Sequence, residues 1–208
     1  NAAKIDWNTA RVQEKIDGSI IKMWHDEDQW HVSTNGTIDA EKAELSTDLP
    51  SSPKNFKALF LDGFFQALKD SPGKEWNPDY TYMFEIVSPF NRIVVPHGET
   101  KLYHIGTRHT KTGQEVNIDI GLPKPREFKL SSYEETVKAA QALPFSEEGY
   151  VVIDGSWNRI KIKSPAYVVA HHLKNNGVIT VSRILDMIRI NESSEFLSYY
   201  PEFEKDFV

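Results

Sequence analysis

The sequence contains no cysteine and no long apolar run. Without cysteine, the 208-residue chain has no disulfide bond, no thiolate metal site and no cysteine nucleophile. No apolar run approaches the roughly 20 residues that a membrane-spanning helix needs. Residues 1–14 are mixed polar, so we expect no signal peptide there. We predict a chain from a reducing compartment, the cytoplasm.

An excess of positive charge is also missing. The chain carries 30 acidic and 24 basic residues, a formal net charge of −6, which argues against a broad basic surface that binds nucleic acid by charge alone. A local basic patch is still compatible with this balance. The hydrophobic content of 39% and charged content of 26% are typical of a globular domain, and the length allows one domain or one domain with an appendage.

The stretch Glu14-Lys15-Ile16-Asp17-Gly18-Ser19 stands just before a β-like run. A lysine becomes a nucleophile when neighbouring cations or desolvation favour its neutral amine. Asp17 is placed to orient that amine or a metal-bound water, and Gly18 lets the backbone approach a ligand closely. The plain alternative is a surface lysine before a turn.

Local patterns predict an α+β fold in which antiparallel sheets are flanked by helices. Runs rich in β-branched and aromatic residues predict strands over 20–24, 29–33, 80–87, 91–95, 102–108, 148–153 and 159–163. Asp154-Gly155 is expected to turn the last two strands into a hairpin.

Helices are expected between and after these strands. Ser52 is the predicted N-cap of the first helix, with Pro53 in its first turn. A second helix is predicted over 131–143, where Ser131 and Glu134 have the spacing of a capping box. Further helical patterns cover 166–174, 180–190 and 193–199.

Four charged residues in otherwise apolar strands join Lys15 as candidates: Glu85, Glu148, Lys161 and Lys163. The two later lysines alternate on one strand and so share a face. The predicted hairpin places that strand beside the one beginning at Glu148. Each position alone is more often a solvated surface residue. Together they suit attack on an α-phosphate, because cations stabilise charge on phosphoryl oxygens and a carboxylate holds a divalent metal directly or through water.

In order and spacing, these motifs resemble the covalent nucleotidyltransferases, which include polynucleotide ligases and mRNA capping enzymes, and are most similar to the phage-type ATP-dependent RNA ligase 1 group. The resemblance covers about residues 12–200. Its motifs are Lys15-Ile16-Asp17-Gly18, Phe84-Glu85, the run from Leu102 to Arg108 with Thr112-Gly113, Glu148-Gly149, and Lys161-Ile162-Lys163-Ser164.

Two positions depart from the family pattern. Asn35 stands in a turn where RNA ligases often carry a lysine, which puts a contact from this turn in doubt. Ile105 stands where many relatives carry an aromatic that stacks on the base. We expect Ile105 to pack against the base, with Tyr103 on the same face as a substitute.

The resemblance implies an ATP-grasp-like ligase adenylation domain of an ATP-dependent RNA ligase. Such an enzyme joins 5′-phosphate and 3′-hydroxyl RNA ends, as in RNA repair, through a lysyl-AMP and an RNA-adenylate. ATP as AMP donor and Mg²⁺, with Mn²⁺ as a substitute, are the implied cofactors, RNA ends are the implied partners, and a monomer is favoured. The implied catalytic residues are Lys15, the nucleophile, with Asp17, Lys161 and Lys163. The implied nucleotide-binding residues are Glu14, Ile16, Gly18, Glu85, Ile105, Lys161 and Lys163, and Glu148 is implied to bind metal through water.

We expect residues 1–165 to form the nucleotidyltransferase core and 166–208 a helical continuation or appendage, in a fragment of a longer ligase. A GTP-dependent capping-type guanylyltransferase or a DNA ligase adenylation domain is the alternative, although both normally need a following OB-fold domain where this chain has helical patterns. A non-catalytic nucleotide-binding domain is a further alternative, against which the intact lysines and glutamates argue.

Overall fold

The computed structural model describes residues 4–45, 47, 49–70, 76–175, 188 and 197. The chain divides into two compact units. One joins Asn1–Lys15 to Lys129–Val208, and the other is the continuous segment Ile16–Phe128. We refer to them as the split unit and the central unit.

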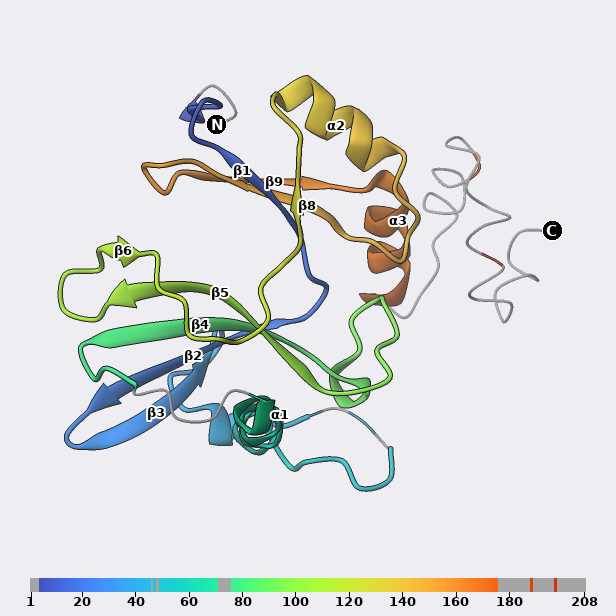
Figure 1. Ribbon diagram of the computed structural model, residues 1–208. Coiled ribbons are helices and arrows are strands. Elements are labelled where there is room, and N and C mark those ends of the chain that lie inside the picture. The colour runs from blue at the N-terminus through green and yellow to red at the C-terminus, as the bar shows by residue number, and fades with distance from the viewer. Residues whose placement is uncertain are drawn as a thin grey trace. The chain divides into compact units, whose positions relative to one another are not determined.

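The central unit is built on a five-stranded antiparallel sheet with the strand order β3-β2-β4-β5-β6 (Figure 1). Its strands are β2 (Ser19–Asp26), β3 (Gln29–Thr34), β4 (Tyr80–Val87), β5 (Lys101–His109) and β6 (Glu115–Val116). The strands predicted over 20–24, 29–33, 80–87 and 102–108 are therefore confirmed.

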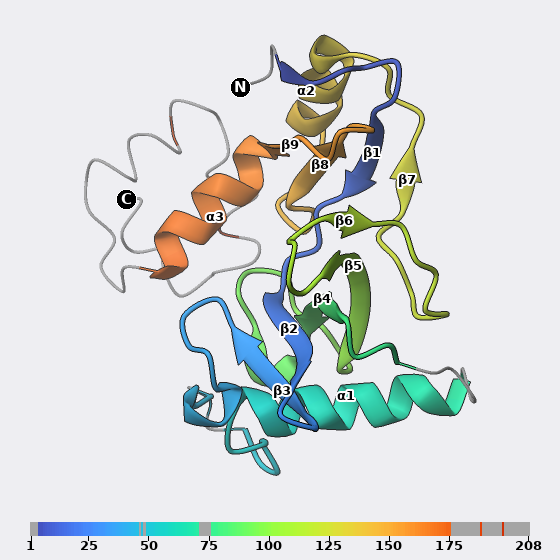
Figure 2. The ribbon, with the colours of Figure 1, turned by 90° about the vertical axis from the view of Figure 1, so that its left-hand side faces the viewer.

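One face of this sheet forms the core of the central unit. Ile21, Phe84 and Leu102 come from three adjacent strands and are at most 2% exposed. Helix α1 (Phe56–Asp70) packs on this face, runs along the sheet in Figure 2, and places the ring of Phe60 5.5 Å from that of Phe84. Burial of each such side chain contributes about 1.5–3 kcal/mol, so this apolar face stabilises the central unit.

The predicted start of α1 is wrong by a few residues. The helix begins at Phe56, and its N-cap is Asn55 instead of Ser52, because the Asn55 side chain accepts a hydrogen bond from the Ala58 amide at 2.9 Å. Asn55 also forms an antiparallel bridge with Glu44. This pairing keeps the chain before Asn55 out of the helix.

The strand predicted over 91–95 does not form. Pro89–Asn91 is a 3-10 helix, η3, and the chain then continues as a loop to β5. The apolar run Ile93-Val94-Val95 favours a strand locally. The amides of Val94 and Val95 donate to the carboxylate of Asp17 instead of to a neighbouring strand.

Strand β5 contains a bulge at Ile105. Met83 pairs with Gly106 and Phe84 with His104, which leaves Ile105 as the extra residue. The two-residue alternation that would place Ile105 on the face of Tyr103 is interrupted at this point.

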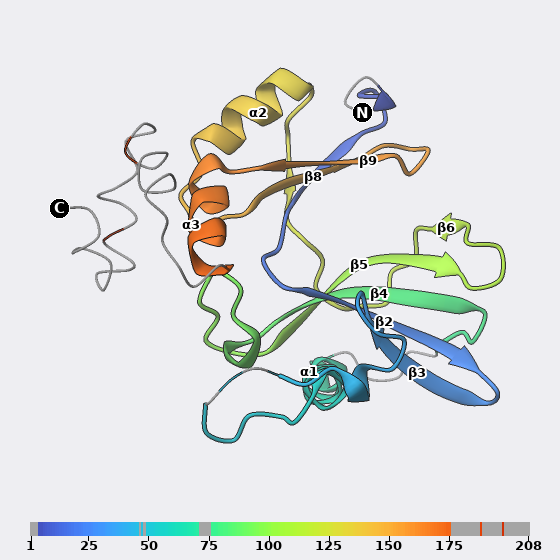
Figure 3. The same ribbon diagram turned by 180° about the vertical axis from the view of Figure 1, so that it is seen from behind.

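In the split unit, β8 (Gly149–Ile153) pairs antiparallel with β1 (Arg11–Glu14) on one side and β9 (Arg159–Lys163) on the other. Figure 3 shows α2 (Tyr133–Gln141) and α3 (Pro165–Asn175) beside these strands, and α2 packs against β8, β9 and α3. The predicted strands 148–153 and 159–163 and the helix 166–174 are confirmed, whereas β1 had no sequence signal strong enough to be predicted. The remaining elements are the 3-10 helix η2 (Ala40–Lys42) and the short strand β7 (Glu127–Phe128).

The capping box of α2 lies one residue later than predicted. Ser132, not Ser131, is the N-cap, and its hydroxyl accepts from the Glu135 amide at 3.1 Å. The Glu135 carboxylate in turn accepts from the Ser131 amide at 2.8 Å. The spacing of the box is retained, with Glu135 in the place predicted for Glu134, but its carboxylate binds the amide before the N-cap instead of the N-cap amide.

A loop over 154–158 connects β8 to β9, in place of the two-residue turn predicted at Asp154-Gly155. The Asp154 carboxylate organises this loop by accepting from the amides of Ser156 and Asn158, both at 2.9 Å. The hydrogen bond from the Asn158 side chain is the main reason that the pKa of Asp154 is lowered. One aspartate side chain thus replaces the backbone pairing of a tighter turn.

The helices predicted over 180–190 and 193–199 lie outside the described residues, apart from positions 188 and 197. Within the part of the chain that the structure describes, no helix is long and apolar enough to cross a membrane.

Candidate active site

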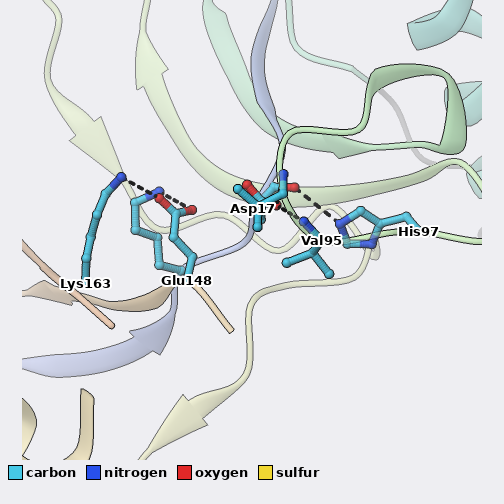
Figure 4. A network of polar contacts seen from close by, with 7 residues as sticks. Asp17, Val95, His97, Glu148 and Lys163 are labelled. Carbon is cyan, nitrogen blue, oxygen red and sulfur yellow. Dashed lines mark hydrogen bonds and ion pairs between the residues drawn. The ribbon is translucent and has the colours of Figure 1, made fainter. Parts of the chain in front are cut away.

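Two ammonium groups of the split unit meet at the carboxylate of Glu148. The Lys15 Nζ atom lies 2.6 Å from Glu148 Oε2, and the Lys163 Nζ atom lies 3.0 Å from Glu148 Oε1 (Figure 4). The side chain of Glu148 is only 5% exposed, against 16% for Lys15 and 38% for Lys163. Three residues predicted separately from the sequence therefore form one Lys15–Glu148–Lys163 cluster.

Backbone pairing across three adjacent strands brings this cluster together. Lys15 follows β1, and its amide donates to the carbonyl oxygen of Gly149 at 2.9 Å. Gly149 is opposite Lys163 in the β8–β9 register. Glu148 directly precedes Gly149, and its carbonyl oxygen accepts from the Ser164 amide at 2.9 Å. The three charged side chains consequently start from neighbouring points at one end of the sheet.

Glycine is required at position 149 by the close approach of β8 and β9. Its φ of +136° is a conformation that other residues rarely adopt. A Cβ atom there would collide with the carbonyl oxygen of Ile162 and lie 2.8 Å from the Cα atom of Lys163. A larger residue would separate the strands that hold Glu148 and Lys163.

The other predicted lysine, Lys161, is exposed and shares the face of Lys163 on β9. It makes no ion pair with a described residue. Lys163 is held on a second side, because its Nζ atom lies 5.2 Å from the ring centre of Tyr167. Tyr167 is 1% exposed and was not predicted as a site residue. The available signal was an aromatic residue four positions after Lys163.

The cluster has two ammonium groups against one carboxylate. Such pairing is needed because a buried carboxylate without a counter-charge is strongly destabilising. The remaining positive charge and the exposed Lys161 produce a local basic patch that the net charge of −6 does not reveal. A patch of this kind suits a polyphosphate ligand.

No group of three or more histidine, aspartate and glutamate side chains suited to a metal ion occurs among the described residues. At the cluster, Glu148 offers a single carboxylate whose two oxygens are both paired with lysines. This donor set fits Mg²⁺ held through water and substrate phosphates, which is the usual mode for this ion, and not a cage of protein ligands.

In the central unit, Asp17 is as buried as Glu148, with 5% exposure, and backbone amides donate to its carboxylate. Its Oδ2 atom accepts from the amides of Val94 at 2.9 Å and Val95 at 2.6 Å (Figure 4). The Nε2 atom of His97 lies 3.3 Å from the Asp17 carbonyl oxygen. Asp17 therefore holds a segment that is distant in the sequence.

Glu85 lies on the sheet face opposite the core. It pairs in register with Ile20 on one side and Tyr103 on the other, so these three residues share a face. Gly18 makes this arrangement possible, because a Cβ atom there would collide with the Ile86 carbonyl oxygen and lie 3.0 Å from the Glu85 Cγ atom.

His104 is a buried residue beside the bulge that sequence reasoning missed. Its Nε2 atom lies 2.8 Å from Thr107 Oγ1 and 3.0 Å from the Gly106 carbonyl oxygen. Its Nδ1 atom is buried and has no hydrogen-bond partner within the described part of the chain. Burial lowers the pKa of His104 to about 4, so the ring is neutral near pH 7. Its signal in the sequence was a histidine within an apolar strand.

The other predicted residues flank these sites. Glu14 ends β1 opposite Tyr150 and is partly buried, and Ile16 is 9% exposed. Asn35 is exposed in the turn after β3, where the Thr34 hydroxyl accepts from the Gly36 amide at 3.2 Å.

Comparison with known proteins finds similarity to viral RNA ligases. No protein-family model matches it. A protein of Autographa californica nuclear polyhedrosis virus, named as a bifunctional polynucleotide kinase/RNA ligase, is 30% identical over 196 residues, which are 92% of this chain and 28% of the viral protein. The RNA ligase of Rhodothermus phage RM378 is 25% identical over 226 residues, 90% of this chain and 51% of the phage protein. The chain is a homologue of viral RNA ligases. It spans about half of the phage protein and under a third of the baculovirus protein.

This RNA ligase homologue also shares its fold with solved RNA ligases. A Naegleria gruberi RNA ligase mutant solved with ATP and Mn superposes with a TM-score of 0.54 and 13% identity, over 82% of this chain and 55% of that one. An archaeal ATP-dependent RNA ligase gives a TM-score of 0.53 and 17% identity, over 79% of this chain and 44% of that one. The predicted α+β nucleotidyltransferase fold and the resemblance to covalent nucleotidyltransferases are confirmed.

Proposed function

We propose that this RNA ligase homologue is the nucleotide-transfer part of an ATP-dependent RNA ligase. The observation that carries the proposal is the Lys15–Glu148–Lys163 cluster, in which a candidate nucleophile lies 2.6 Å from a buried carboxylate that also binds a second lysine. The names of the viral relatives support this choice of reaction. We place the core of this activity in residues 1–165, with 166–208 as a continuation or an appendage.

Lys15 is the proposed nucleophile. Its neutral amine attacks the α-phosphorus of ATP, a nitrogen–phosphorus bond forms, the bond to the bridging oxygen breaks, and pyrophosphate leaves. Lys15 must first release a proton to solvent. The ion pair with Glu148 stabilises the protonated amine, so it has to be weakened before the proton leaves. Glu148 would hold Mg²⁺ through water, and the ion would supply positive charge that weakens the Lys15–Glu148 ion pair and stabilises the phosphoryl oxygens.

The other residues bind and orient ATP. Lys163 and Lys161 lie on one face of β9 and hold the phosphates in this proposal. Glu85 accepts hydrogen bonds from the ribose hydroxyls. Tyr103, on the face of Glu85, and Ile105, at the bulge, are the proposed contacts of the base. Glu14, Ile16 and Gly18 complete the proposed nucleotide-binding set beside Lys15.

Two further transfers complete the proposed reaction on RNA. An oxygen of a 5′-phosphate end attacks the phosphorus of lysyl-AMP, the nitrogen–phosphorus bond breaks, and the RNA-adenylate forms. The 3′-hydroxyl of a second end then attacks the 5′-phosphorus, loses its proton to solvent and releases AMP. Both transfers need in-line alignment of the reacting groups, which binding of the RNA ends must provide.

The test is the intact mass of the 208-residue chain after incubation with ATP and Mg²⁺. We expect a gain of one AMP that Lys15→Ala abolishes and that hydroxylamine or acid removes, as for a phosphoramidate. Labelling by GTP but not ATP would favour a guanylyltransferase. No covalent nucleotide with either substrate would favour a non-catalytic domain and overturn the proposal.

A further inference from the structure

We propose that Asp17 is a positioning residue, whose carboxylate holds the loop between β4 and β5 and thereby sets the position of Glu85. The inference rests on the proposed function, in which Glu85 contacts the ribose of ATP. It replaces the role expected from the sequence, in which Asp17 orients the lysine amine or a metal-bound water.

The hydrogen bonds of Asp17 are those of a structural anchor. One oxygen accepts from two consecutive amides, Val94 at 2.9 Å and Val95 at 2.6 Å, and hydrogen bonds to an ionised acceptor are the stronger kind. Val94 is fully buried. Without Asp17, its amide would lose its acceptor in a buried position, a defect that costs about 1–3 kcal/mol.

The loop is tied to the sheet at several other points, so the carboxylate fixes a defined conformation. Ser88 and Thr100 join their hydroxyl groups at 2.8 Å where the loop leaves β4 and enters β5. The Asn91 side chain donates to the hydroxyl of Ser19 at 2.8 Å. Asp17 and Ser19 thus hold the loop from both sides of Gly18.

Gly18 connects this anchor to Glu85. Its Cα atom is packed so closely on β4 that an added Cβ atom would lie 3.0 Å from the Glu85 Cγ atom. Ser19 and Ile20, the next two residues, pair with Ile86 and Glu85. A shift of the backbone at Asp17 therefore moves the surface against which the Glu85 side chain rests. The expected functional consequence is weaker binding of the ribose and poorer discrimination against 2′-deoxyATP.

The experiment compares Asp17→Asn with the wild-type chain and with Asp39→Asn as a matched control. Asp39 makes the same kind of contact, a carboxylate accepting from the Glu41 amide at 3.0 Å, at the N-cap of η2 in the same unit. Self-adenylylation is measured against ATP, 2′-deoxyATP and Mg²⁺ concentration. In parallel, trypsin cleavage after the exposed Arg92 is followed by mass, since Arg92 lies in the loop that Asp17 anchors.

Asp17→Asn keeps one oxygen acceptor but removes its charge, which weakens both hydrogen bonds to the loop. We expect cleavage after Arg92 to accelerate about tenfold and the half-saturating ATP concentration to rise about tenfold, with the rate at saturating ATP within about threefold of wild type. The preference for ATP over 2′-deoxyATP should fall about fivefold, and the Mg²⁺ requirement should stay unchanged. Adding Glu85→Ala to Asp17→Asn should cause no further loss of that preference. Asp39→Asn should alter none of these quantities.

Val95→Pro disrupts the same contact from the side of the loop. Proline has no amide proton, so one of the two donors to Asp17 is removed while Asp17 itself stays intact. This variant should reproduce the Asp17→Asn pattern, and the double variant should be no worse than the poorer single one. A raised Mg²⁺ requirement with unchanged trypsin cleavage, or additive effects of Asp17→Asn and Val95→Pro, would overturn the positioning role. Absence of lysyl-AMP in the wild-type chain would instead overturn the proposed function itself.

Discussion

Glu148 and Asp17 are equally buried carboxylates, each 5% exposed, and they differ in the groups that donate to them. Glu148, in the split unit, is paired with the side chains of two lysines. Asp17, in the central unit, accepts from two backbone amides. An ammonium on a long flexible stem can exchange one partner for another, whereas an amide is fixed by the fold. Burial alone therefore does not tell a carboxylate that is available for chemistry from one that has a structural role. The groups that donate to the carboxylate are more informative.

The largest expected effect is at Lys15, which is paired with Glu148. Lys15→Arg keeps the positive charge beside the carboxylate but removes an amine that can lose its proton. We expect no covalent adenylate in this variant, while its thermal unfolding remains close to that of wild type. Intact mass after incubation with ATP and Mg²⁺ measures the adduct. A gain of one AMP in Lys15→Arg would exclude Lys15 as the nucleophile.

The second prediction tests whether the charge of Glu148 matters beyond its shape. Glu148→Gln conserves the volume and one acceptor, but leaves two ammonium groups without their counter-charge. We expect self-adenylylation at saturating ATP to slow by about a hundredfold or more, and Glu148→Ala to be no better. Glu134→Gln is the control, since Glu134 is an exposed residue on α2 of the same unit. Near-normal labelling in Glu148→Gln would remove Glu148 from the proposed metal-binding role.

A third prediction separates nucleotide transfer from RNA sealing. Lysyl-AMP formation needs the nucleotide site alone, whereas sealing must also hold two RNA ends on a chain whose net charge is −6. We expect the joining of a pre-adenylylated RNA to be weak and to fall about tenfold between low and physiological salt, with self-adenylylation changing little. Both rates are measured on one preparation at two salt concentrations. Robust and salt-tolerant sealing would show that this chain binds RNA ends well by itself.

The smallest effect concerns His104, a buried residue whose Nδ1 atom has no hydrogen-bond partner among the described residues. Since its pKa is lowered to about 4 in the folded chain, the unfolded chain binds more protons between pH 6.5 and pH 4, and stability is lost as the pH falls through this range. From pH 7 to pH 5 this contribution amounts to about 2 kcal/mol. Urea unfolding at both pH values should show a correspondingly smaller pH dependence for His104→Gln. An equal dependence in both proteins would mean that other groups cause it.

Most of the strands could be predicted from the sequence, and the exceptions have a common cause. The strand 80–87 was predictable because its alternating residues match a sheet with one buried face. The segment 91–95 has an equally suitable composition, but Asp17 captures its amides from 77 residues away. The start of α1 was misplaced for the same reason, since Asn55 is engaged by Glu44. Local propensity does not register such distant partners.

The candidate site was likewise predictable in residue type but not in geometry. Residue order and type identified Lys15, Glu148 and Lys163, because a nucleotide-transfer reaction needs an amine, a carboxylate and cations whatever their geometry. The pairing of β1, β8 and β9 then determined that these three side chains meet at one carboxylate. Nothing in Lys15-Ile16-Asp17-Gly18 indicates that its aspartate anchors a loop, because a carboxylate accepts hydrogen bonds from any donor within reach. Which donors lie within reach of a buried oxygen depends on the packing of the whole unit.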